Sequence, residues 1–138
     1  MSSLPEVMIP DAAVQDLPGP APEAEDPASI HVALMARREL AIDAFRQTWD
    51  PDRLTRRLCE ATDIALRALW RLHDPGRGVT LAAVGGYGRT EFFPHSDVDL
   101  LILVPEAVGE ACQARLSTFI SACWDAGLPI GQSVRTLD

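Results

Sequence analysis

The feature that most constrains the fold is a segment in which two apolar runs flank a polar loop. Residues 79–84 are β-prone and stop at Gly85-Gly86, and residues 98–104 are almost continuously apolar. An apolar run of this length between polar residues predicts a strand that is buried on both faces. The segment therefore predicts two strands of a sheet, joined by a loop over residues 87–96.

Two helices are expected before this segment. Residues 30–49 contain good helix formers, and Ser29 is suited to be their N-cap. Asp50-Pro51 then predicts an N-cap followed by a first helical position, and the second helix should end near His73. Apolar residues recur along it at steps of three and four, which predicts one buried stripe. The stripe consists of Leu54, Leu58, Ala61, Ala65, Leu69 and Leu72.

After the strands, residues 106–126 are predicted to form a third long helix, with Gly127 as its C-cap. Its inner face should contain Ala111, Leu116, Phe119, Ile120 and Cys123. A weak strand pattern follows over residues 130–137. The order helix, helix, strand, strand, helix, strand predicts a mixed α/β fold of the α+β kind.

The 138 residues have room for one compact domain. Residues 1–28 are rich in Pro, Ala and acidic residues and have no period, which predicts a disordered acidic leader before a domain over residues 29–138. No apolar run is long enough to cross a membrane, and no secretory signal is visible. We therefore expect a cytoplasmic protein that does not bind membranes.

Charge and cysteine content narrow the function further. The formal net charge is -8 and every basic residue is Arg, which excludes catalysis by a P-loop or Schiff-base lysine. The negative charge also argues against a nucleic-acid-binding protein. Cys59, Cys112 and Cys123 form no zinc-ligand pattern, so we expect three reduced cysteines in the core.

Asp97 and Asp99 are the candidate catalytic residues. Residues two apart in a strand point to the same face, so both carboxylates should project together. Such a pair repels unless a cation lies between its members, and oxygen ligands suit Mg²⁺. Asp-x-Asp also occurs as a simple turn or cap. A carboxylate directly before the run 100–104 is costly without a compensating charge, which favours the metal interpretation.

Gly85 and Gly86 end the first strand, where residues without Cβ allow close approach of a ligand and exposed N–H groups can bind an anion. A plain tight turn is the alternative. A Rossmann dinucleotide site is excluded because Glu91 stands where its third glycine should be and no long helix precedes the next strand.

Together, Val84-Gly85-Gly86 and Asp97-Val98-Asp99-Leu100 resemble the signature of the DNA polymerase β-like nucleotidyltransferases. GGYGRTEFFPHSDVDLLIL looks like the N-terminal catalytic segment of the bacterial PII uridylyltransferase/uridylyl-removing enzymes, and the similarity extends over about residues 80–137. The resemblance implies a nucleotidyltransferase-type mixed sheet that is incomplete at the C-terminus.

The resemblance also implies roles for single residues. Gly85 and Gly86 would contact the phosphates of UTP, and Asp97 and Asp99 would bind Mg²⁺ as both catalytic and metal-binding residues. A third carboxylate, which the superfamily takes from a later strand, is not identified.

The loop contributes two further nucleotide-binding candidates, Arg89 and Ser96. Arg89 could form a fork to a phosphate, or alternatively an ion pair with Glu91 or Asp97. Thr90 stands where the family usually has Gly, and a β-branched residue takes positive φ only at a cost.

The implied reaction is transfer of UMP from UTP to a tyrosine of the PII signalling protein, with release of pyrophosphate. The chain would then be the front part of a longer enzyme whose hydrolase and regulatory domains lie outside the 138 residues. Two alternatives remain open. One is a related enzyme with another acceptor, such as glutamine synthetase or a small molecule, and the other is an inactive fragment that binds nucleotide.

Overall fold

The computed structural model of the chain describes residues 6–8, 26–106 and 108–137. A single mixed sheet contains four strands in the order β1-β2-β3-β4. The strands are β1 (Glu6–Met8), β2 (Thr80–Ala83), β3 (Val98–Pro105) and β4 (Ile130–Leu137). Strand β2 runs parallel to β1 and antiparallel to β3, and β4 runs parallel to β3.

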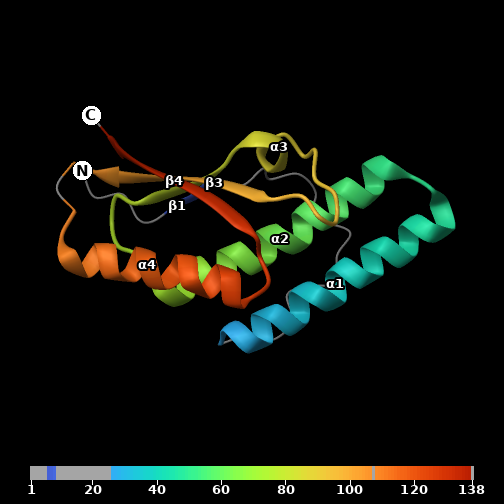
Figure 1. Cartoon of the computed structure of the whole chain (residues 1–138), viewed down its shortest axis with the longest axis horizontal. Helices are drawn as coiled ribbons and strands as arrows, with labels where there is room; N and C mark the ends of the chain where they lie inside the picture. The colour runs from blue at the N-terminus through green and yellow to red at the C-terminus, as the bar shows by residue number, and fades with distance from the viewer. Residues whose placement is uncertain (1–5, 9–25, 107, 138) are drawn as a thin grey trace.

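Three long helices, α1 (Pro27–Thr48), α2 (Pro51–His73) and α4 (Glu110–Asp125), lie together on one side of this sheet (Figure 1). The fourth helix, α3 (Gly85–Gly88), is a single turn that follows β2. Helix α4 makes the crossover that parallel neighbours such as β3 and β4 require. The predicted mixed α+β class is confirmed, and the six predicted elements occur in the predicted order, whereas β1 and α3 were not predicted.

Both N-terminal helices begin in the same way. Asp50 caps α2 by accepting from the backbone N–H of Arg53 at 3.2 Å, with Pro51 in the first turn, as predicted. Asp26 caps α1 by accepting from Ser29 N–H at 2.7 Å, with Pro27 after it. The prediction that Ser29 is the N-cap was therefore wrong. A carboxylate followed by proline is the stronger start signal, and it occurs three residues earlier.

The core lies between the sheet and the long helices. Trp70 of α2 and Phe119 of α4 meet edge to face in it, with ring centroids 5.1 Å apart. Strand β3 alternates along its length between fully and partly buried residues. The prediction that this strand is buried on both faces was thus wrong, because in the described part of the chain the long helices cover only one side of the sheet.

Two residues of the predicted apolar faces also differ from expectation. Leu72, in the last turn of α2, is 44% exposed, whereas the rest of its stripe is buried. Ala111 is exposed in the first turn of α4. Cys59 and Cys123 are buried and Cys112 is half-buried, and all three are free thiols.

Most of the predicted leader lies outside the described residues, and so its predicted disorder is not tested there. Two parts of it are described: Glu6–Met8 pair with β2, and residues 26–28 lie at the start of α1. No helix among the described residues combines the length and the apolar character needed to span a bilayer.

Candidate active site

The predicted loop connects two strands that pair directly. Strands β2 and β3 are antiparallel neighbours with Ala83 opposite Leu100, and the N–H of Val84 donates to the carbonyl of Asp99 at 3.0 Å. This pairing brings the end of β2, where the glycines lie, beside the start of β3, where the aspartates lie. The two halves of the sequence motif therefore meet at one end of the sheet.

The Asp99 carboxylate lies between two glycines. A Cβ built at Gly85 would lie 2.5 Å from Asp99 Oδ2, and one built at Gly131 of β4 would lie 3.3 Å from Oδ1. Gly85 also has φ +62°, a conformation that disfavours side chains. The carboxylate is thus flanked by backbone of the α3 turn on one side and of β4 on the other, and a larger residue at position 85 would displace it.

Asp97 is exposed and immediately precedes β3, whereas Asp99 is half-buried. Val98 between them is buried, so burial alternates through this stretch and both carboxylates belong to the less buried side. Within the described ranges neither carboxylate has an ion-pair partner. Both are available to a cation.

The two carboxylates, Asp97 and Asp99, fit Mg²⁺ only as part of its ligand set. No group of three or more His, Cys, Asp or Glu side chains within the described ranges is arranged to hold a metal ion. Two carboxylates alone are the type of site in which Mg²⁺ takes its remaining ligands from substrate phosphates and water. The residues therefore fit a metal that is held jointly with a nucleotide.

Arg89 and Ser96 have their side chains engaged within the loop. Arg89 Nε lies 3.3 Å from Glu91 Oε2, which is one of the two predicted ion pairs, and both side chains are 65% exposed. An exposed pair of this kind is weak, so Arg89 can exchange Glu91 for a phosphate at little cost. Ser96 Oγ accepts from the N–H of Phe93 at 3.0 Å, which closes the turn before Asp97.

Backbone geometry explains why the loop is rich in glycine. A Cβ at Gly88 would lie 2.7 Å from the carbonyl oxygen of Ala83, and one at Gly86 would lie 3.0 Å from that of Glu91. Thr90 has φ +61°, so the residue that stands in place of a glycine adopts the positive φ that glycine favours.

Three side chains of the long helices hold this loop, and sequence reasoning assigned none of them a role. The Tyr87 hydroxyl donates to Asp63 Oδ1, Thr55 Oγ1 donates to the carbonyl of Phe92 at 2.8 Å, and Arg38 donates to the carbonyl of Pro94. The sequence carried a signal for Thr55 alone, a hydroxyl residue beside the apolar stripe of α2 that is buried and therefore needs a partner.

Asp63 is electrostatically unusual among these groups. Burial raises the pKa of its carboxyl to about 7, against the opposing effects of the Tyr87 hydroxyl and the Arg67 guanidinium. Burial likewise raises the pKa of the Tyr87 hydroxyl. A carboxyl that titrates near neutrality thus supports the loop that joins the two halves of the motif.

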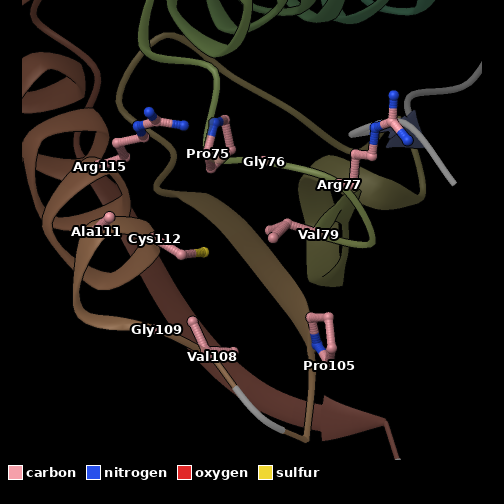
Figure 2. A pocket seen from close by; sticks show the side chains of 10 residues that line it. All are labelled: Pro75, Gly76, Arg77, Val79, Pro105, Val108, Gly109, Ala111, Cys112 and Arg115. Carbon is pink, nitrogen blue, oxygen red and sulfur yellow. The ribbon is translucent and has the colours of Figure 1, made fainter. Parts of the chain in front are cut away.

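A pocket of about 300 Å³ lies at the opposite end of β2 and β3 (Figure 2). It is lined by the turn after α2, the end of β3 and the first turns of α4, and its two arginines, Arg77 and Arg115, lie on opposite sides of it. None of the predicted site residues lines this pocket. It is separate from the carboxylate site.

Residues 65–129 match the nucleotidyltransferase domain family, and this match includes both glycines and both aspartates. The chain therefore contains a nucleotidyltransferase domain, and its mixed α/β fold agrees with this class. The relatives are more specific. They are bifunctional uridylyltransferase/uridylyl-removing enzymes, and the chain is homologous to them over most of its length.

The enzyme of Ralstonia nicotianae is 47% identical over 105 residues, which are 76% of this chain and 12% of the relative. That of Bordetella avium is 50% identical over 104 residues, 75% of this chain and 12% of the relative. That of Burkholderia vietnamiensis is 44% identical over 120 residues, 86% of this chain and 13% of the relative. The chain thus spans about an eighth of their length. No solved structure matches the chain.

Proposed function

We propose that this chain carries the uridylyl-transfer site of an enzyme that moves UMP from UTP to a tyrosine hydroxyl of the PII signalling protein and releases pyrophosphate. The observation that carries the proposal is the placement of the Asp99 carboxylate between Gly85 and Gly131, with Asp97 beside it at the exposed start of β3. Uridylyl transfer is supported by the names of the relatives, and the PII tyrosine by the family resemblance of residues 85–103.

In this reaction the acceptor oxygen forms a bond to the α-phosphorus, the bond to the β-phosphate oxygen breaks, and the acceptor proton passes to solvent. Asp97 and Asp99 would hold Mg²⁺, which would neutralise charge on the α-phosphate and on the departing pyrophosphate. Gly85 and Gly86 would let the phosphates approach the backbone closely. The reaction needs no nucleophilic side chain, so the chain's contribution is positioning and charge stabilisation.

The test measures transfer of labelled nucleotide to PII by the chain, with UTP or ATP and Mg²⁺, together with calorimetric titration of Mg·UTP. We expect Asp97→Asn and Asp99→Asn each to lower transfer at least about 100-fold, as removal of a charge-stabilising group does. Asp43→Asn is the matched control, because Asp43 is an exposed carboxylate of α1 that pairs with Arg46 on the same helix. It should transfer UMP at the wild-type rate.

Each competing function has its own outcome. Preference for ATP, or transfer to glutamine synthetase or a small molecule in place of PII, would point to a related nucleotidyltransferase. Tight binding of Mg·UTP without transfer would identify a nucleotide-binding fragment. Wild-type transfer by either aspartate variant would refute the assignment of the carboxylates.

A further inference from the structure

Helix α2 contacts the short helix α3 through one polar pair. Tyr87, the third residue of α3, is 2% exposed, and its hydroxyl donates to the Asp63 carboxylate of α2. Its ring also meets Phe92 edge to face, with centroids 5.3 Å apart. The side chain of Tyr87 thus runs from the glycine turn to the helical layer, and its far end is held by Asp63.

The backbone of α3 transmits this constraint. The N–H of Gly88 donates to the carbonyl of Val84 at 2.9 Å, and the N–H of Thr90 donates to the carbonyl of Tyr87 at 3.1 Å. A shift of Tyr87 would therefore move the whole turn. Gly85 has little room for such a shift, because it already borders the Asp99 carboxylate.

We propose that Asp63 is a positioning residue of the nucleotide site, which sets the orientation of α3, and with it Gly85 and Gly86, through the Tyr87 hydroxyl. The effect on nucleotide binding rests on the proposed function. The positioning of α3 does not, and it can be measured without nucleotide.

The charged and titratable groups that act on this pair come from both helices. Asp63 interacts with Tyr87 of α3 and with Arg67 and Glu60 of α2, and Cys59 of α2 acts on Tyr87. Because the pKa of Asp63 lies at about 7, its charge changes in the neutral range. Ionised Asp63 accepts the stronger hydrogen bond, so Mg·UTP affinity should rise between about pH 6 and pH 8.

The experiment compares Asp63→Asn, Asp63→Ala and Tyr87→Phe with the wild-type chain, and uses Asp43→Ala, at an exposed position of α1, as the control. Asp63→Asn keeps an oxygen acceptor but cannot ionise, whereas Asp63→Ala removes the acceptor. The first measurement is amide hydrogen exchange of residues 85–91 without nucleotide. We expect about tenfold faster exchange there in Asp63→Ala and Tyr87→Phe, as for loss of one hydrogen bond to a charged group. Asp63→Asn and the control should resemble wild type.

The second measurement is the Kd for Mg·UTP from about pH 6 to pH 8. Asp63→Ala should bind about tenfold more weakly, and Asp63→Asn should lose the pH dependence while it retains affinity within about threefold. Unchanged exchange at residues 85–91 in Asp63→Ala overturns the proposal. Exchange that accelerates equally in α4 and β3 also overturns it, since this is general destabilisation. A wild-type chain that binds no Mg·UTP refutes the proposed function, and the exchange data then still decide the positioning role.

Discussion

Substitution of Gly85 by alanine tests the site most directly, because one atom is added beside Asp99. The new Cβ would lie 2.5 Å from Asp99 Oδ2, at a residue with φ +62°. The left-handed conformation costs a residue with a side chain about 1–2 kcal/mol, and loss of glycine's freedom in the unfolded chain offsets about 0.4–1 kcal/mol of this. The net loss of stability is about 1 kcal/mol, or roughly 4 °C in Tm.

The effect on binding should be larger than the effect on stability. The carboxylate must move to make room, and displaced support around a metal ligand typically costs about 10–100-fold in metal affinity. Calorimetric titration of Mg·UTP at a temperature where the variant is fully folded measures this loss.

Gly76→Ala is the matched control. Gly76 has φ +115° and nothing lies within 4 Å of its Cβ position, so the substitution introduces backbone strain without touching a carboxylate. It should lower Tm at least as much as Gly85→Ala and leave the Kd for Mg·UTP unchanged. Equal affinity of the Gly85→Ala variant and the wild type would refute the reasoning, because Asp99 would then not need its observed position.

Three further predictions concern stability and reactivity. Thr90 has φ +61°, so Thr90→Gly should relieve strain and raise the free energy of unfolding by up to about 1 kcal/mol in urea titrations; a loss would contradict the strain. The pKa of Asp63 rises from 3.8 to about 7 in the folded protein, which therefore holds this proton more tightly than the unfolded chain does. The contribution of Asp63 to the free energy of unfolding should accordingly fall as pH rises from about 4 to about 7. Over this pH range the urea midpoint of the Asp63→Asn variant should fall less than that of the wild type. Burial raises the pKa of Cys59 and Cys123 to about 12, so iodoacetamide should modify half-buried Cys112 first; equal rates at all three would contradict their burial.

Much of the fold was predictable because its signals are local. The start of α2 at Asp50-Pro51 and the strands on either side of the loop follow from caps, turn residues and apolar runs. The adjacency of Gly85 to Asp99 also follows once the two strands pair. These features need only short stretches of sequence, and the prediction was correct there.

The remaining features depend on contacts between distant segments. The position of Gly131 against Asp99 depends on the register of β4 on β3, and the link from Asp63 to Tyr87 depends on how α2 packs. The number of covered faces of β3 is set by the layers around it, which an apolar run does not encode. Sequence periodicity reports that a residue is apolar, but not which neighbour it meets.

The two glycines around Asp99 also have a kinetic consequence. Gly85 precedes β3 and Gly131 follows α4, so the carboxylate acquires both neighbours only after the crossover through α4 has docked β4. Parallel pairing of this kind is non-local and forms slowly relative to helices and hairpins. Recovery of Mg·UTP affinity during refolding should therefore lag behind helix formation. The rate of this recovery would report when β4 docks onto β3.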